Sequence, residues 1–318
     1  MALSHSSSAP AKLYAFLLKL RPLQQGTLMP FSGELVHGAW LGWLRSAAPD
    51  VAAWLHEGSK QRLFTCSSLQ FALPEGRMHQ AERENVHLPL DPEKTYTIRI
   101  TLLLGELFPL FHNALMHFNM TEFGAKKPPF MRIGKQVFLL EEVLADRDDP
   151  SGWTGFTSFA QLVEKAKTLR LGKAEPLALE FASLTTFNRG NAKNRAYGNH
   201  FARLPLPQYI FPGLARRWQE LAPPDLAHVV QLERVEQYMQ DDGVVVVDYD
   251  LRPHQVHFTT HVQPGFVGVC KYHVRGPDEE TTAEVPLTVK QQVLLLAQLA
   301  FYCGVGYKTA MGMGQVRL

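Results

Sequence analysis

Cysteine is scarce in this sequence: the three thiols, Cys66, Cys270 and Cys303, lie far apart along 318 residues. This scarcity and spacing exclude a disulfide framework and a zinc ribbon, and they are typical of a protein in a reducing cytoplasm. Uncharged apolar runs of about 18 residues or more are also missing, so we expect no membrane span. Residues 1–12 lack a basic segment before an apolar one, which predicts a loose tail instead of a signal peptide.

Acidic residues are missing from two segments, residues 181–219 and 285–318, which hold six and three Lys/Arg respectively. Because the whole chain has a net charge of only +2, the remaining residues are net negative. Positive charge concentrated in this way is typical of proteins that bind a polyanion. Chance clustering is the alternative interpretation.

Hydrophobic periodicity predicts the secondary structure of each half of the chain. In the first half we expect strands at residues 12–20, 63–73 and 95–104, and helices at 33–46, 49–55 and 107–118. A strand or hairpin is expected at 129–143. An acidic, turn-rich linker at 146–155 and a helix at 158–168 come next. In the second half we expect strands at residues 176–186, 244–249, 255–262, 266–274 and 314–318. Helices are expected at 212–221 and 285–303.

Each half therefore resembles the element order β-α-β-β-α-β, although the second has three strand segments between its helices, and the predicted domains are residues 1–145 and 146–318. This is the order of a ferredoxin-like unit, so the sequence predicts an α+β protein with two tandem ferredoxin-like (RRM-like) domains. The length and the hydrophobic fraction of 46% agree with two globular cores. Sheets of this kind can hold unpaired RNA bases, but a fold alone does not determine a function.

The C-terminal sequence is rich in glycine around a single cation. The four glycines that bracket Lys308 are Gly304, Gly306, Gly312 and Gly314. Free N–H groups in such a loop can cradle an anion, and Lys308 adds a positive charge, so the loop is a candidate phosphate-binding site. A simple turn between a helix and a terminal strand is the alternative. The loop is not a Walker motif, because Tyr307 stands where that motif has glycine.

Basic residues alternate with aromatic ones in the segment that follows residue 188. The basic residues are Arg189, Lys193, Arg195, His200 and Arg203, and the aromatic residues among them are Tyr197 and Phe201. Such a mixture suits phosphate contacts combined with base stacking, with a solvated loop as the alternative. Arg216 and Arg217 precede Trp218 on a predicted helix, where we expect Trp218 in the core and at least one arginine facing RNA.

Four segments together resemble a known family. They are residues 54–65 (Trp-Leu-His-Glu-Gly-Ser-Lys-Gln-Arg-Leu-Phe-Thr), 183–187 (Ser-Leu-Thr-Thr-Phe), 206–218 with its Arg-Arg-Trp, and the glycine loop, preceded by Gly-Glu-Leu-Val-His at 33–37. They are similar to the CRISPR-associated endoribonucleases of the repeat-associated (RAMP) superfamily, which cut repeat RNA into guide units. The resemblance extends over residues 13–318. The Leu-His-Glu helix end combined with the Arg-Arg-Trp helix is its more specific part.

The resemblance implies two ferredoxin-like domains and cleavage of CRISPR repeat RNA without a metal ion or cofactor. In this family the 2′-OH attacks the neighbouring phosphate and leaves a 2′,3′-cyclic phosphate and a 5′-OH. The implied partners are precursor and product RNA. The resemblance leaves open a homodimer and membership of a CRISPR effector complex.

The resemblance also points to catalytic residues. His56 matches the family's usual histidine, and an imidazole titrates near neutral pH, as an acid or base must. Lys60 and Arg62 lie close by in sequence and could stabilise the dianionic phosphorane. A surface histidine at a helix end is the alternative for His56. His37, which opens the first helix, is the second candidate, with RNA or interdomain contact as its alternative.

One feature of the family is absent. Some relatives complete a Tyr-His-Lys set with a tyrosine in the first helix, but residues 40–43 here read Trp-Leu-Gly-Trp. A complete triad is therefore not implied, and we expect another group to substitute or the enzyme to be a slow, single-turnover one. A catalytically inactive RNA-binding RAMP subunit and a small-ligand phosphate-binding enzyme remain as alternative functions.

Three histidines near the end of the chain, His254, His257 and His261, suggest a metal site that we reject. We expect them on an alternating strand, on which His254 and His257 point to opposite faces. His257 and His261 then stand ~13 Å apart at ~3.3 Å per residue. One zinc ion, with Zn–N bonds of about 2.1 Å, cannot bind both.

Overall fold

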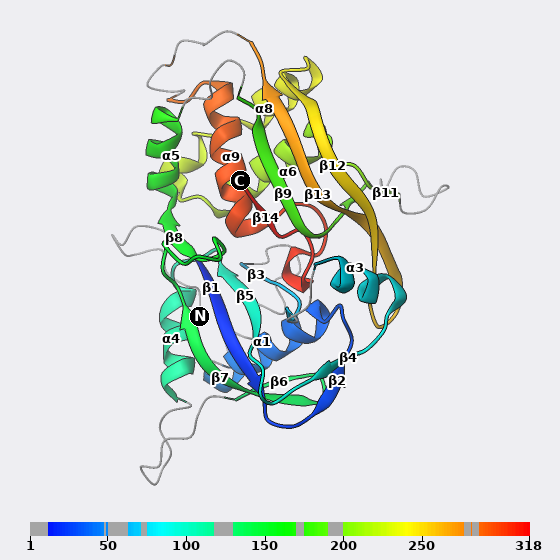
Figure 1. The fold of residues 1–318 in the computed structure, drawn as a ribbon. Helices are drawn as coiled ribbons and strands as arrows, with labels where there is room; N and C mark the ends of the chain where they lie inside the picture. Colours follow the sequence, from blue (N-terminus) through cyan, green and yellow to red (C-terminus); the bar gives the residue numbers. More distant parts are fainter. Residues whose placement is uncertain are drawn as a thin grey trace.

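The computed structural model describes residues 12–47, 49, 63–70, 75–117, 130–169, 175–189, 200–276, 281 and 286–318. Two β-sheets lie one above the other, each with its own helices (Figure 1). None of the helices in these ranges is long and apolar enough to cross a membrane.

The first sheet is antiparallel. Its order is β3 (Phe64–Cys66), β5 (Tyr96–Leu102), β1 (Lys12–Pro22), β7 (Gln136–Leu144) and β6 (Phe130–Ile133), and β8 (Gly155–Ser158) pairs with the start of β1. Helices α1 (Gly33–Ala47) and α4 (Leu107–His117) supply Trp40, Leu44 and Phe111 to the core beneath it. A short ribbon of β2 (Gly26–Leu28) with β4 (Leu88–Leu90) and the polar helix α3 (Glu75–Glu84) complete this half.

The second sheet has the order β12 (Val244–His257), β13 (Val262–Val274), β9 (Leu177–Thr185) and β14 (Val316–Arg317). Its core is formed with α5 (Phe159–Thr168), α6 (Pro207–Leu221), α8 (Leu232–Gln240) and α9 (Val289–Cys303). The other elements of the described residues are β10 (Phe187–Asn188), β11 (Phe201–Ala202), α7 (Pro224–Ala227) and the short 3-10 helix η2 (Thr309–Met311). Capping boxes at Ser158 and Thr288 start α5 and α9.

The two sheets share one topology. The four strands of a β-α-β-β-α-β unit, numbered along the chain, lie side by side in the order 2-3-1-4 in each sheet. That order is β3-β5-β1-β7 in the first sheet and β12-β13-β9-β14 in the second. The predicted tandem ferredoxin-like fold is therefore confirmed. The boundary at residues 145 and 146 stays a prediction. The strand β8, which follows that boundary, belongs to the first sheet because it pairs with β1.

Several predicted ranges need correction. The strands expected at 244–249 and 255–262 form one strand that ends at His257, and residues 258–261 form a turn into β13. The helix expected from 212 begins at Pro207. Of the strand expected at 63–73, the described residues form β3 with isolated bridges at Ser67 and Gln70, and residues 71–73 lie outside the described ones. The strand expected at 314–318 contracts to β14. The short helix expected at 49–55 falls almost entirely outside the described residues.

The β12–β13 hairpin extends past the sheet to which it belongs and reaches the first half of the molecule (Figure 1). His254 Nε2 lies 2.6 Å from Glu82 Oε2 of α3. Near the hairpin turn, the Thr259 hydroxyl donates to Glu34 Oε2 of α1 at 2.9 Å. The hairpin thus connects the two halves beside the start of α1.

Candidate active site

The glycine loop runs from the end of α9 to β14 and lies between the two sheets (Figure 1). Gly306 has φ +86°, and a Cβ there would stand 2.5 Å from Thr186 O. Only glycine tolerates both that conformation and that close approach. The other three glycines of the loop also have positive φ. The sequence needs glycine here to fold the loop tightly against β9.

The N–H groups of the loop are less open to an anion than the glycine pattern predicts. Val305 N donates to Gly314 O, Tyr307 N to Thr186 O, and Gly314 N to Leu184 O. These donors stabilise the loop and are not directed at a ligand. Binding of an anion at this loop would therefore depend chiefly on side chains. Lys308 is the cationic side chain between Gly304 and Gly314.

His37 lies where α1 meets the glycine loop. Its Nδ1 donates to the carbonyl oxygen of Ala310 at 2.8 Å, and its ring stacks on Phe64 with the centroids 5.3 Å apart. Cys66 Sγ donates to the same carbonyl at 2.9 Å. A carbonyl can only accept, so Nδ1 carries the proton of a neutral His37, and Nε2 is the nitrogen able to take one up. Residues 273 positions apart thus fix the orientation of this imidazole.

Lys308 lies two residues before Ala310 in an unusual conformation. Its backbone is left-handed, with φ 55° and ψ 39°, which is uncommon for a residue other than glycine, asparagine or aspartate. Its ammonium stands 3.7 Å from the centroid of Phe258 and 3.3 Å from His261 Nε2. Burial, and secondly the charge of Lys308, hold the pKa of His261 below its usual value.

Three of the predicted RNA-binding arginines line one small cavity beside the loop. This cavity of about 300 Å³ is bounded by Arg189, Arg216, Arg217, Gly304 and Gly306, among others. Each arginine already has a contact: Arg189 lies over the Tyr209 ring, Arg216 pairs with Glu236 at 2.6 Å, and Arg217 pairs with Glu220 at 2.7 Å. Trp218 is fully buried, as expected.

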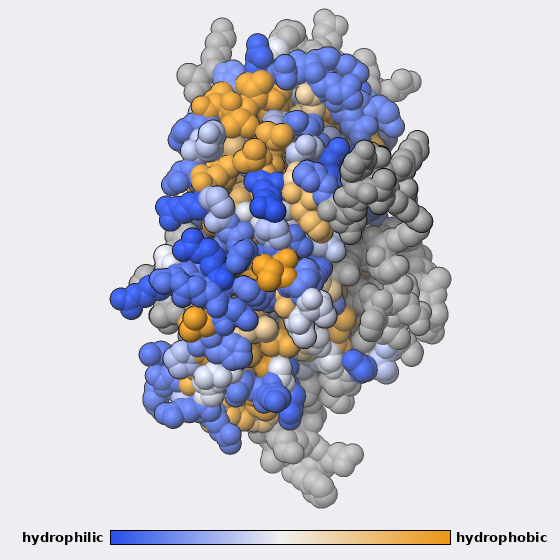
Figure 2. Space-filling model, turned by 90° about the vertical axis from the view of Figure 1, so that its right-hand side faces the viewer, coloured by the Kyte–Doolittle hydropathy of each residue, from blue (hydrophilic) through white to orange (hydrophobic). Residues whose placement is uncertain are grey.

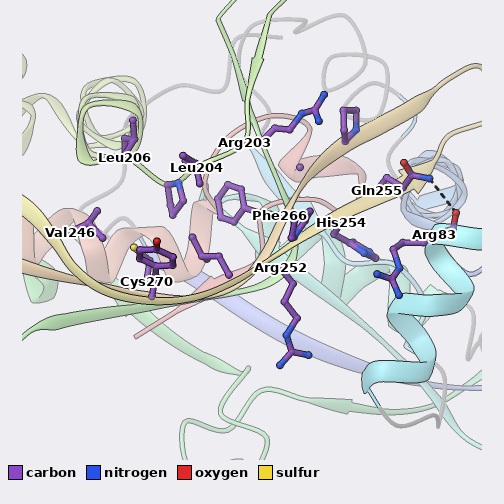
Figure 3. Close-up of a pocket in the computed structure, with 16 residues that line it drawn as sticks. Arg83, Arg203, Leu204, Leu206, Val246, Arg252, His254, Gln255, Phe266 and Cys270 are labelled. Atoms are coloured by element: carbon purple, nitrogen blue, oxygen red, sulfur yellow. Dashed lines mark hydrogen bonds between the residues drawn. The ribbon is translucent and has the colours of Figure 1, made fainter.

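The structure separates Arg203 from those three arginines. It lines a larger cavity of about 800 Å³ on the β12–β13 hairpin, together with Arg83 and His254 at one end and Leu206 and Val246 at the other (Figure 3). A hydrogen bond from Gln255 to Arg83 O closes part of its rim. On the surface, hydrophobic side chains gather in the upper part of the view in Figure 2. Among the residues that line this cavity, Leu204 is 55% exposed.

Five predicted site residues lie outside the described residues: His56, Lys60, Arg62, Lys193 and Arg195. Among the others, the structure places His37 against the glycine loop that holds Lys308. It gathers Arg189, Arg216 and Arg217 with Gly304 and Gly306 around one cavity, whereas Arg203 lines a different one.

The histidines considered as metal ligands prove to be on different elements. His254 and His257 are on β12, whereas His261 is the last residue of the turn that follows, so the ~13 Å spacing expected along one strand was wrong. Within the described part of the chain, no cluster of three or more His, Cys, Asp or Glu could hold a metal ion. Sequence reasoning missed the contact of His261 with Lys308, because that contact depends on the hairpin turn.

Comparisons with known proteins agree with this geometry. A family model described as the CRISPR Cas6 N-terminal domain matches residues 13–164. A second, described as CRISPR-associated endoribonuclease Cas6, matches residues 179–316. The comparison with curated proteins gives no match.

Solved structures of Cas6 proteins share the fold over almost the whole chain. Thermus thermophilus Cas6 is 24% identical with a TM-score of 0.63, and the match covers 98% of this chain and 99% of that one. Its product complex is also 24% identical with a TM-score of 0.70, covering 96% and 99%. The product complex of another Cas6 is 23% identical with a TM-score of 0.62, covering 96% and 98%.

At these identities the solved structures show the fold. The two family models show more, because together they extend over nearly all of the sequence and both describe the same family. The chain belongs to the Cas6 family of CRISPR-associated endoribonucleases.

Proposed function

We propose that this Cas6 protein cuts CRISPR repeat RNA without a metal ion, by attack of a ribose 2′-OH on the adjacent phosphate. The O2′–P bond forms as the P–O5′ bond breaks, which leaves a 2′,3′-cyclic phosphate on one product and a 5′-OH on the other. A base must take the 2′-OH proton, and an acid must give one to the leaving O5′. Family membership supports an RNA endonuclease that processes CRISPR repeats, and the chemical steps are our proposal.

The hydrogen bond from His37 to Ala310 is the observation that carries this proposal. A histidine that acts in proton transfer needs a partner that fixes its tautomer, and a backbone carbonyl bonded to Nδ1 is such a partner. Stacking on Phe64 restricts the ring further. The contact also places the imidazole against the loop that holds Lys308. The positive charge of Lys308 would stabilise the negative charge that develops on the phosphorane. We therefore assign His37 a role in proton transfer.

His56 remains the proposed partner of His37. One histidine would act as the base and the other as the acid, and Lys60 and Arg62 would add positive charge. Support for this assignment comes from the family resemblance of residues 54–65. The tryptophans in the first helix, Trp40 and Trp43, are buried in the core, so neither takes the place of the tyrosine found in some relatives.

The proposed RNA path follows the cations of the C-terminal half. We assign phosphate contacts to Lys308 and to the cavity of Arg189, Arg216 and Arg217. Family resemblance and charge add Lys193, Arg195 and Arg203. Two of the similar solved structures are product complexes, which agrees with repeat RNA as the ligand of this fold. A homodimer and an effector complex stay predictions.

The test is cleavage of labelled repeat RNA in excess EDTA. We expect wild-type protein to cut normal RNA and to leave RNA with a 2′-deoxyribose at the cut site intact. The upstream product should resist phosphatase until acid opens its cyclic phosphate. His37→Ala and His56→Ala should each slow cleavage by about 10²–10⁴-fold, whereas His112→Ala, an exposed histidine of α4, should not.

The alternative function, a catalytically inactive RNA-binding subunit, gives a different outcome. Such a protein would bind the repeat without cutting it under any of these conditions. Cleavage that requires added metal, or that proceeds on the 2′-deoxy RNA, would overturn the proposed chemistry.

A further inference from the structure

The tip of the β12–β13 hairpin contacts Lys308 with two side chains. Phe258 places its ring 3.7 Å below the ammonium, and His261 places Nε2 3.3 Å from Nζ. The two rings stack, with their centroids 4.9 Å apart and their planes 3° from parallel. Lys308 belongs to the glycine loop, so its ammonium is held by a segment that lies about 50 residues earlier in the chain.

This hairpin tip is itself fixed in place. Phe258 is buried in a small hydrophobic cluster with Phe31, Leu184, Val256 and Met313, and its ring meets the edge of Phe31 at 5.0 Å. Phe258 N donates to His261 O across the turn, and both the amide and the hydroxyl of Thr259 donate to Glu34. The hairpin tip therefore presents His261 from a rigid support at the junction of the two halves.

The chemistry of the contact defines the state of His261. An ammonium has only donors, so His261 Nε2 must accept, and the imidazole must be neutral. Its Nδ1 then carries the proton and can donate to the Thr260 hydroxyl 3.0 Å away. Burial lowers the pKa of His261 most, the charge of Lys308 lowers it further, and the charge of Glu34 raises it. The lowered pKa agrees with a neutral acceptor.

The backbone of Lys308 gives an independent indication. A lysine in the left-handed region costs conformational energy that glycine would avoid, and such costs are typical of functional positions. The ammonium lies over an aromatic face and against an imidazole nitrogen, and these two contacts hold its charge in place.

We propose that His261 is a positioning residue for Lys308, which it holds as the cation that meets the scissile phosphate beside His37. This role rests on the proposed function. His37 contacts Ala310, two residues beyond Lys308, and Glu34 lies one helical turn before His37, so all these groups surround the same short segment of the loop.

A double-mutant cycle tests the proposal. We would measure single-turnover cleavage at saturating RNA for wild type, His261→Phe, Lys308→Ala and the double variant. His261→Phe keeps a ring to stack on Phe258 but removes the acceptor nitrogen, and we expect roughly a tenfold loss of rate. In the Lys308→Ala background the same change should alter the rate by less than about twofold, because the partner is already gone.

Two further variants separate positioning from a general structural role. His261→Gln supplies an oxygen acceptor that cannot titrate, and it should recover most of the rate that His261→Phe loses. His257→Phe, on the same hairpin but bonded to Arg83 O, is the matched control and should cleave at the wild-type rate. Equal slowing by His261→Phe in both backgrounds, or a His261→Gln variant as slow as His261→Phe, would overturn the proposal.

Measurements without cleavage distinguish this proposal from the proposed function. NMR titration of the RNA-free protein should give His261 a pKa below its usual value, and Lys308→Ala should raise it. An unchanged pKa in Lys308→Ala contradicts the pairing. If the wild-type protein did not cut RNA, the proposed chemistry would fail. The same four proteins could then be compared by their dissociation constants for 2′-deoxy repeat RNA, which would still show whether His261 acts through Lys308.

Discussion

Arg99 Nη1 of β5 donates to Gln315 Oε1, just after the glycine loop, at 2.5 Å. The same guanidinium donates to Phe301 O at the end of α9 and to Trp153 O, and only 1% of the residue is exposed. Burial lowers the pKa of Arg99 to about 9, so the group stays protonated at neutral pH. One buried cation thus connects the first sheet to both ends of the segment that holds Lys308.

Replacement of Arg99 should therefore reduce both stability and cleavage. Arg99→Met fills much of the same space but leaves one buried and two partly buried acceptors without their donor, which should lower the free energy of unfolding by about 1–3 kcal/mol. Urea denaturation measures this change. Arg252→Met, at an exposed side chain paired with Asp250, is the control and should stay within about 0.5 kcal/mol of wild type. A similar small effect at Arg99 would argue against its connecting role.

Gly306 should not tolerate a side chain. Gly306→Ala would place a Cβ 2.5 Å from Thr186 O at φ +86°, so we expect a loss of about 1–3 kcal/mol in stability together with weaker RNA binding. Gly42→Ala is the matched control, because that helical position has no atom within 4 Å of the added Cβ. It should gain about 0.5–1 kcal/mol. Thermal unfolding and RNA affinity of the two variants would be compared, and an unimpaired Gly306→Ala protein would contradict the close packing.

Lys308 should account for one phosphate contact. Lys308→Ala is expected to weaken repeat RNA binding and to reduce the slope of log K against log salt by about 0.7–0.9, the value for one released counterion. Lys135→Ala, an exposed lysine in the β6–β7 turn, should leave the slope unchanged. Binding titrations at several salt concentrations give the slopes. A Lys308→Ala slope equal to that of wild type would remove the lysine from the RNA interface.

His261 should make stability depend on pH in a defined direction. Its pKa is lowered in the folded protein, so between that value and about 6.5 the unfolded chain binds more protons. Stability therefore rises with pH across this window, and His261→Gln should remove that part of the rise. Urea denaturation between about pH 5 and pH 7 would show it. Parallel curves for the two proteins would mean that His261 titrates normally.

Much of the fold followed from local patterns in the sequence. The spacing of Val36, Trp40 and Leu44 predicted α1, and those side chains do face the core. The polar helix α3 was missed because it has little apolar periodicity and is held by tertiary contacts such as Glu82 with His254. The break expected between residues 249 and 255 does not occur: Pro253 lies within β12, which is an edge strand, where a proline does not interrupt the sheet. Pro207 begins α6 at a position where proline is favourable.

The site was only partly predictable, for physical reasons. His37, Lys308 and the glycines could be named from residue type and resemblance, but their mutual placement depends on contacts between distant residues. The hydrogen bond of His37 to Ala310 joins residues 273 positions apart. Its acceptor is a backbone carbonyl, which every residue type has, so the sequence does not indicate it. His261 required the turn at 258–261, where two threonines give no glycine, proline or asparagine signal.

The most direct test of the account is the single-turnover rate of His37→Ala on repeat RNA in EDTA, measured beside His112→Ala. We predict a loss of about 10²–10⁴-fold for His37→Ala with RNA affinity nearly unchanged, and a wild-type rate for His112→Ala. A His37→Ala protein that cuts within about threefold of wild type would contradict the assignment of proton transfer to this residue.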